Sequence, residues 1–149
     1  MKIIELMSIK NKNMYIEQLS QCEWIAGRFL AKIVMNGEFI KLCKENAKVF
    51  LLVENDEIIS FCTYAMQDEI YAPDMFPWIG FVYTYEQYRG NHYFGKLLDY
   101  IITLAKKENH KNIYVSTNAT GLYEKYGFKY YTNMLDITGN DSRIYCIDL

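Results

Sequence analysis

The segment of residues 88–95, with the sequence YRGNHYFG, has the composition of a loop that binds an anion. It follows an apolar stretch at residues 78–84 that we expect to form a strand, and it leads into a helical stretch. The first amides of a helix have no partner within the helix, and its positive pole favours negative charge. Gly90 and Gly95 let the backbone approach a phosphate closely. Many such loops bind nothing, so the segment alone predicts a phosphate or pyrophosphate site without naming the ligand.

A second segment, residues 123–128 with the sequence YEKYGF, stands near the other end of the chain. It follows the stretch NIYVST at residues 112–117, an expected strand, and we expect a short helix over residues 121–126 that Gly127 ends. Apolar residues recur at helical spacing between the two segments, at Phe94, Leu97, Leu98, Ile101, Leu104 and Ala105. Strand, loop, helix and strand then form a right-handed βαβ unit whose two strands are parallel. The second segment therefore follows directly on the strand that pairs with the strand before the anion loop.

The remaining elements complete an α/β domain. Residues 3–9 are expected to form a first strand, and residues 13–46 are expected to be helical with breaks near Gly27 and Gly37. Two apolar runs joined by the polar turn at residues 54–57, ENDE, form an antiparallel hairpin, and two more strands close the chain. The expected strands are therefore 48–53, 58–66, 128–137 and 142–149. This order describes a mixed sheet with helices on both faces, and the hairpin disfavours a purely parallel nucleotide-binding fold.

The composition limits the classes of protein that remain. The chain of 149 residues is 51% hydrophobic with a formal net charge of −2, which predicts a single domain over residues 1–149 and no nucleic-acid partner. The four cysteines form no C-x-x-C pair and lie far from the two histidines, so we expect reduced thiols and no metal site. The N-terminus is too polar for a signal peptide and no apolar run is long enough to cross a membrane, which predicts a cytoplasmic protein.

The two segments together resemble the GNAT superfamily of acetyl-CoA-dependent N-acetyltransferases. FVYTYEQYRG, residues 81–90, is similar to the family's fourth strand and acetyl-CoA loop, and YVSTNATGLYEKYGF, residues 114–128, is similar to its fifth strand and following helix. The order of elements extends the resemblance over nearly the whole chain. It implies a three-layer fold in which a mixed, mostly antiparallel sheet of seven strands is splayed between strands 4 and 5.

The resemblance also implies the roles of individual residues. The backbone of Tyr83 and Thr84 would bond the pantetheine arm of acetyl-CoA as an added strand would. Tyr123 would lie near the thioester sulfur and protonate the departing thiolate, a transfer that suits the ordinary acidities of a phenol and a thiol. The loop that would enclose the pyrophosphate consists of Arg89, Gly90, Asn91, His92, Tyr93, Phe94 and Gly95.

The chain departs from the family pattern at two places. The loop has His92 and Phe94 where small residues are usual, and Phe94 also begins the apolar stripe of the helix, so we expect it to be a core residue first. An asparagine often stands seven residues before the tyrosine, and here Ser116 stands there while Asn118 follows two residues later. Either of these two residues would contact the cofactor in its place.

The base that deprotonates the amine is left open by the sequence. The strand at residues 78–84 contains no acid, so the candidates are Asp68, Glu69 or an ordered water. We expect the acceptor pocket to be formed by the N-terminal helices and the loop at residues 71–78, with walls drawn from Trp24, Phe29, Phe39, Phe76 and Trp78.

The predicted function is transfer of an acetyl group to a primary amine of a small molecule or a protein by direct attack. The alternatives are a module that binds acetyl-CoA without turnover, and an unrelated nucleotide-binding α/β protein. A homodimer formed through the last strand, SRIYCIDL, is a further expectation, and the sequence does not identify the acceptor.

Overall fold

The computed structural model describes residues 1–149, and all seven strands lie in one sheet of order β1-β2-β3-β4-β5-β7-β6. All neighbouring strands are antiparallel except β4 and β5, which run parallel as expected for the two strands of a βαβ unit. The strands are β1 (Lys2–Glu5), β2 (Lys48–Glu54), β3 (Glu57–Ala65), β4 (Trp78–Thr84), β5 (Asn112–Thr117), β6 (Lys129–Leu135) and β7 (Asp141–Asp148).

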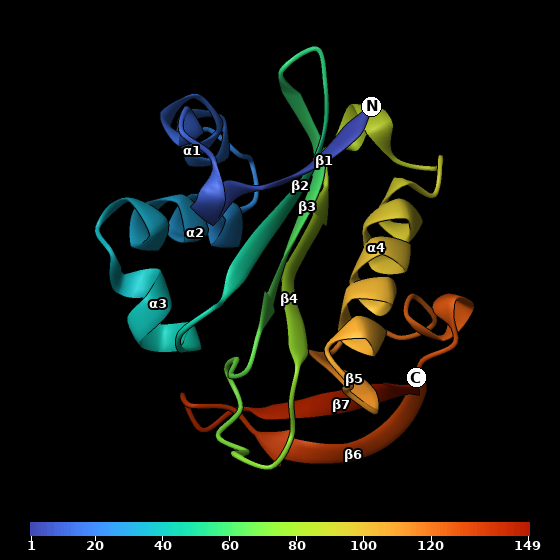
Figure 1. Ribbon diagram of the computed structural model, residues 1–149. Coiled ribbons are helices and arrows are strands. Elements are labelled where there is room, and N and C mark those ends of the chain that lie inside the picture. Colours follow the sequence, from blue (N-terminus) through green and yellow to red (C-terminus); the bar gives the residue numbers. More distant parts are fainter.

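The sheet is splayed between β4 and β5. These strands pair only at Trp78 with Tyr114 and at Ile79 with Val115, after which β4 continues without a partner on that side. Figure 1 shows β2, β3 and β4 running along the length of the molecule while β6 and β7 lie across its lower end. The predicted fold class, an α/β sheet of seven strands splayed at this point, is confirmed.

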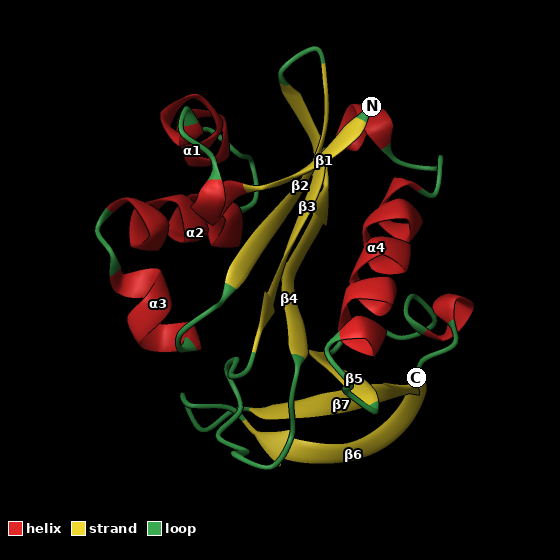
Figure 2. Ribbon diagram, in the orientation of Figure 1, coloured by secondary structure: helices red, strands yellow, loops and turns green.

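Helices cover both faces of the sheet (Figure 2), and each face has its own core. The N-terminal helices α1 (Lys12–Ser20), α2 (Ile25–Met35) and α3 (Glu38–Cys43) pack on one face. The long helix α4 (Tyr93–Lys107) packs on the other face through the apolar side chains that the sequence predicted, including Phe94, Leu97 and Ile101.

Three expected elements differ in the structure. The first strand ends at Glu5, because the Glu5 carboxylate accepts the Met7 amide at 2.6 Å and begins a 3₁₀ turn over Leu6–Ser8. The segment before Gly127 is also a single 3₁₀ turn, Glu124–Tyr126, and Gly127 ends it with a φ of 95°. The last strand, β7, lies between β5 and β6. It is therefore not an edge that another chain can pair with, and that position belongs to β6.

The break between the first two helices lies at residues 21–24, before the expected position at Gly27. The Arg28 guanidinium donates to the carbonyls of Cys22 at 2.6 Å and Glu23 at 3.0 Å, which holds this link against the start of α2. Gly27 lies inside α2, where a Cβ would stand only 2.9 Å from the sulfur of Cys22 and 3.2 Å from Phe61 Cζ. Gly27 permits this close packing and does not break the helix.

Replacement of Gly27 by alanine is expected to lower the free energy of unfolding by about 1 kcal/mol in urea denaturation. Alanine favours a helix interior by about 1 kcal/mol over glycine, but overpacking costs about 1–3 kcal/mol. The same substitution in a Cys22→Ala background should be less destabilising, because the nearest atom, the Cys22 sulfur, is then absent. An increase in stability from Gly27→Ala in the wild-type background would contradict this account of the glycine.

Candidate active site

The loop before α4 presents unpaired backbone donors at the helix N-terminus. Gly90 has a φ of +84° and His92, the residue before the helix, has a φ of 57°, so the chain turns sharply into α4. The backbone amides of residues 90–94 have no acceptor within the protein. The flanking amides are bonded, since Arg89 donates to the Glu86 carbonyl at 3.2 Å and Gly95 donates to the His92 carbonyl at 3.0 Å. This geometry suits a phosphate or pyrophosphate group.

The side chains of this loop hold its shape. Arg89 turns back over the Tyr83 ring, with its Cζ 5.2 Å from the ring centroid, and its Nε donates to the Thr84 carbonyl at 2.8 Å. The Asn91 amide group donates to the carbonyls of Tyr88 at 3.1 Å and Arg89 at 3.3 Å. The Arg89 and Asn91 side chains therefore stabilise the conformation of the loop, and the free backbone amides remain available to bind an anion.

The remaining predicted loop residues divide between solvent and core. His92 is exposed, and Tyr93 is partly buried with its ring near the Lys96 ammonium. Phe94 lies in the core against the rings of Tyr123 and Tyr126. Gly95 allows close approach as well, since a Cβ there would stand 3.3 Å from the Tyr126 ring.

Strand β4 leaves peptide groups open where the sheet splays. The strand carries one extra residue relative to β3, with Phe81 at a φ of 48° in the irregularity. Beyond it, the Tyr83 carbonyl accepts a hydrogen bond from Ser60 Oγ of β3 at 2.9 Å. Because peptide groups alternate along a strand, those of Val82 and Thr84 face the open side, where the Thr84 carbonyl already accepts Arg89 Nε and its amide remains open. Thr84 thus lies where the sequence placed it, while Val82 takes the position that had been expected of Tyr83.

A cleft of about 630 Å³ opens at the same splay, between β4 and β5. It is bounded by the N-terminal helices, the segment after β3, the two diverging strands and the turn between β6 and β7. Its lining residues are Trp24, Ala26, Phe29, Ile33, Leu42, Cys43, Gln67, Asp68, Glu69, Gly80, Phe81, Val82, Val115, Ser116, Thr117, Tyr123, Asp136, Ile137 and Thr138.

Tyr123 reaches this cleft from the turn after β5. Its ring is 5% exposed and is held edge-on between Phe94, at 6.2 Å between centroids, and Phe128, at 5.7 Å. Tyr123 is one of the residues that line the cleft, and its hydroxyl makes no hydrogen bond to the protein. Burial, with smaller contributions from Cys62, Asp68 and Tyr126, raises the pKa of Tyr123 well above its ordinary value. The group therefore remains a neutral proton donor in the physiological range.

Asp68 lies in the same cleft, in the segment that leaves β3. Burial is the main cause that raises the pKa of Asp68 to about 6, the nearby charge of Glu69 also raises it, and the Glu69 backbone amide opposes the shift. The carboxylate packs directly over Gly80 of β4, where a Cβ would collide with Oδ1. Glycine at residue 80 thus allows Asp68 to face the open strand edge, with the acidity of a base that works near neutral pH.

Glu69 and Ser116 form a separate polar chain beside Asp68. Ser116 Oγ lies 2.7 Å from Glu69 Oε1 and 2.6 Å from Ser142 Oγ, so the serine connects β5 to the carboxylate. Asn118 is exposed and makes no hydrogen bond with the protein. Of the two residues predicted to replace the usual asparagine, only Ser116 lines the cleft.

The aromatic walls predicted from the sequence are present only in part. Trp24 and Phe29 line the cleft, whereas Phe39 and Trp78 are fully buried core residues. Phe76 packs edge-on against the His110 ring outside the cleft, at 6.0 Å between centroids. Sequence reasoning missed two parts of the cleft lining, Phe81 and the turn at residues 136–138. A hydrogen bond from the Ile137 amide to the Glu69 carbonyl at 2.8 Å holds this turn against the segment after β3.

Comparison with family models identifies the family of this chain. The model described as the acetyltransferase (GNAT) family matches residues 11–128, which include Asp68, the amide loop and Tyr123. The chain belongs to the GNAT acetyltransferase family. Comparison with curated protein sequences gives no significant match.

Solved GNAT structures share the fold over almost the full chain. An acetyltransferase from Elizabethkingia anophelis with acetyl-CoA bound has a TM-score of 0.64 at 15% identity, covering 99% of this chain and 97% of that one. The aminoglycoside 6′-N-acetyltransferase from Enterococcus faecium has a TM-score of 0.71 at 15% identity, with coverage of 99% and 97%. An acetyltransferase from Streptococcus agalactiae 2603 has a TM-score of 0.69 at 21% identity, with coverage of 99% and 98%.

The co-substrate of the GNAT family, acetyl-CoA, fits the groups found in this member. Its pyrophosphate matches the free amides of residues 90–94 at the positive pole of α4. Its amide-containing arm matches the open peptide group of Val82 and the open amide of Thr84, which an unpaired strand edge offers to an added strand. No group of three or more His, Cys, Asp or Glu side chains is arranged to hold a metal ion. None of the helices combines the length and apolar character of a membrane span.

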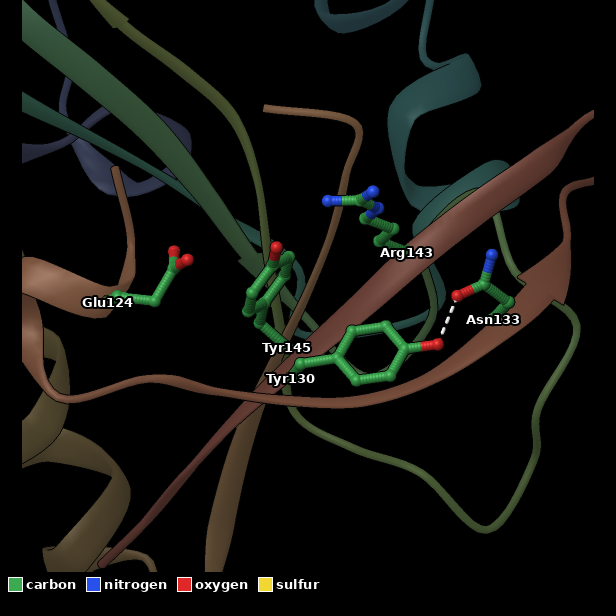
Figure 3. Close-up of a pocket in the computed structure, with 5 residues that line it drawn as sticks. All are labelled: Glu124, Tyr130, Asn133, Arg143 and Tyr145. Carbon is green, nitrogen blue, oxygen red and sulfur yellow. Dashed lines mark hydrogen bonds between the residues drawn. The ribbon is translucent and has the colours of Figure 1, made fainter. Parts of the chain in front are cut away.

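A second, smaller hollow of about 360 Å³ lies on β6 and β7 of this GNAT domain, away from the splay (Figure 3). The Tyr130 hydroxyl donates to Asn133 Oδ1, and the Asn133 amide group donates to Asp141 Oδ2 at 2.7 Å. Glu124, Arg143 and Tyr145 complete the lining. The hollow shares no residue with the cleft, and none of its lining residues belongs to β4 or to the loop before α4, so we assign the chemistry to the cleft.

Proposed function

We propose that this protein transfers the acetyl group of acetyl-CoA to a primary amine by direct attack of the amine. The observation that carries the proposal is the juxtaposition of a proton donor and a proton acceptor in one cleft at the splay. The Tyr123 hydroxyl has no hydrogen-bond partner in the protein, and Asp68 lines the same cleft with a pKa of about 6. Family membership and the match to N-acetyltransferase structures support this reading.

Binding and orientation of the co-substrate are assigned to backbone groups. The amides of residues 90–94 would hold the pyrophosphate, and the peptide groups of Val82 and Thr84 would hold the pantetheine arm beside β4. Acetyl-CoA when bound supplies an activated acyl group on a thiol leaving group. The strand edge then directs that group into the cleft between Asp68 and Tyr123.

The two titratable side chains move the protons. An alkylamine is mostly protonated at neutral pH, so a base must remove a proton before the nitrogen can attack. Asp68 accepts it, directly or through one ordered water, and Glu69 lies next to it as a further carboxylate. The nitrogen forms its bond to the acetyl carbon as the C–S bond breaks, Tyr123 donates its proton to the departing sulfur, and the second proton of the nitrogen restores the Tyr123 phenol. The four cysteines are free thiols, which suits a reducing compartment, and we place the reaction in the cytoplasm. The acceptor we propose is a small-molecule amine that fits a cleft of about 630 Å³.

Titration calorimetry with acetyl-CoA tests the binding step. We expect micromolar affinity, about −8 kcal/mol, and no heat with ATP, which has no pantetheine arm to pair with β4. Asn91→Asp should weaken the affinity about tenfold, because it places a negative charge beside the free amides and removes the two donors that hold the loop.

The matched control is Asn13→Asp, which makes the same chemical change at an exposed residue in the first turn of α1. It should leave acetyl-CoA affinity unchanged. Absence of acetyl-CoA binding to the wild-type protein would remove the proposed function. Equal weakening by both variants would remove the assignment of the pyrophosphate to this loop.

A further inference from the structure

The mouth of the cleft gathers apolar side chains that are exposed to water. Phe29 of α2 is 49% exposed, Leu42 of α3 is 43% exposed and Ile137 of the turn after β6 is 71% exposed, and all three line the cleft. They come from three separate elements, so local sequence does not explain why they converge. Exposed apolar groups that meet at a concave surface are typical of a site that receives an apolar ligand.

Aromatic rings form a platform behind this rim. Phe29 stacks on Phe81 with 6.4 Å between centroids and 17° between planes, and Trp24 meets Phe81 edge-on at 6.5 Å. Phe81 adopts a φ of 48°, which is uncommon for a bulky residue and places its ring in the cleft at the irregularity of β4. We name Trp24, Phe29 and Phe81 the ring platform. Such faces bind an aromatic or aliphatic body and also attract a cation.

The charge of the cleft has one sign. Asp68, Glu69 and Asp136 line it, no Lys, Arg or His does, and neither of the protein's two ion pairs involves these carboxylates. The pKa of Asp136 is lowered, chiefly because its Oδ1 accepts the Thr138 hydroxyl at 2.5 Å, and also because it accepts the amides of Asn140 at 3.0 Å and Thr138 at 2.9 Å. A site with several carboxylates and no cation attracts a positively charged ligand and repels a negative one.

We propose that the acetyl acceptor is a cationic primary amine carried on an apolar or aromatic body, without a carboxylate beside the amine. The amine would lie at Asp68 and the body on the ring platform, with Phe29 as the residue that sets the specificity. This inference rests on the proposed acetyl transfer and adds the class of acceptor. Amino acids are disfavoured because their carboxylate would face three others. Polyhydroxylated amines are disfavoured because the ring platform offers few hydrogen-bond partners.

A matched panel of amines tests this class through the rate of CoA release. 2-Phenylethylamine and ethylamine differ by the phenyl ring, and 2-phenylethylamine and phenylalanine differ by the carboxylate. Spermidine and kanamycin supply positive charge without an apolar body of this kind. We expect kcat/KM for 2-phenylethylamine to exceed that for ethylamine by about 10- to 100-fold, the range that burial of one ring provides. It should also exceed the values for phenylalanine, which adds a carboxylate, and for spermidine and kanamycin, which lack the ring.

Phe29→Ala tests the specificity residue, and its high exposure means that truncation should not unfold the protein. The KM for 2-phenylethylamine should rise about tenfold, while ethylamine turnover and acetyl-CoA affinity hold. Met35→Ala is the matched control, since Met35 lies on the same helix at 64% exposure and outside the cleft. Trp24 fluorescence gives a readout without turnover, because the other tryptophan, Trp78, is buried elsewhere.

The outcomes separate this inference from the proposed function. Preference for phenylalanine, spermidine or kanamycin, with acetyl-CoA bound and consumed, would overturn the acceptor class and leave acetyl transfer standing. If no amine is turned over, equal responses of Trp24 fluorescence to 2-phenylethylamine and ethylamine would overturn it as well. A protein that binds no acetyl-CoA fails at the earlier step, and calorimetry alone reports that failure.

Discussion

Replacement of Tyr123 by phenylalanine is expected to lower kcat about 100-fold or more while the affinity for acetyl-CoA stays within twofold. The substitution removes only the hydroxyl, and the ring keeps its edge-on packing against Phe94 and Phe128. Because the hydroxyl makes no hydrogen bond in the protein, its loss leaves no unsatisfied partner and should not change stability. A positioned general acid contributes about 10²–10⁴-fold to a rate. Single-turnover kinetics with calorimetry of acetyl-CoA binding measures both quantities.

Tyr126→Phe is the matched control for this prediction. Tyr126 lies three residues later, packs edge-on against the same Phe94 ring at 5.5 Å and is outside the cleft lining. The Tyr126→Phe variant should keep the wild-type kcat. If Tyr123→Phe also retains the wild-type kcat, an ordered water protonates the thiolate and Tyr123 has only a packing role. If acetyl-CoA binds but neither the variants nor the wild-type protein acetylates any amine, the protein is better described as a module that binds acetyl-CoA without turnover.

Asp68→Asn is expected to lower kcat/KM about 100-fold and to abolish the acidic limb of the pH profile. In the wild-type protein the carboxylate must be ionised to accept a proton, so activity should fall as the pH drops through about 6, the pKa to which burial raises Asp68. The asparagine side chain does not titrate, so this limb should be absent from the variant's profile. A pH–rate profile of both proteins under subsaturating amine measures the effect.

Glu69→Gln distinguishes the two neighbouring carboxylates. Glu69 is exposed and accepts the Ser116 hydroxyl, and a glutamine can still accept that bond. We expect a loss of no more than about fivefold, with the limb near pH 6 retained. A larger loss for Glu69→Gln than for Asp68→Asn would transfer the base to Glu69.

The same Asp68→Asn variant should be more stable than the wild type at neutral pH. A carboxyl whose pKa is higher in the folded than in the unfolded protein is penalised when ionised. The penalty is absent below about pH 4, grows as the pH rises to about 6, and is full above that. We therefore expect a gain on the order of 1–2 kcal/mol at pH 7 that disappears near pH 4. Urea denaturation at both values would show it, and an equal gain at both would contradict the electrostatic cause.

Local sequence patterns determined much of the secondary structure of this protein. The bounds predicted for β4 and β5 agree with the structure, because each is a short apolar run between polar or turn residues. The apolar stripe of α4 likewise fixes which face of that helix is buried, and with it the place of the loop at the helix N-terminus. The free amides of residues 92–94 follow from helix geometry, whatever the side chains of His92 and Phe94 are, whereas those of Gly90 and Asn91 depend on the turn that leads into the helix.

Tertiary structure decided which residues meet in the cleft. Trp24 and Phe39 are both aromatic residues of the N-terminal helical segment, yet one lines the cleft and the other is fully buried, because packing on the sheet selects the face. Whether Val82 or Tyr83 presents its peptide group at the open edge depends on how β4 pairs with β3. A shift of the register by one residue would turn each peptide group of β4 to the opposite side. Asp68 and Tyr123 are far apart in the sequence, and only the splay of β4 from β5 brings them to one cleft.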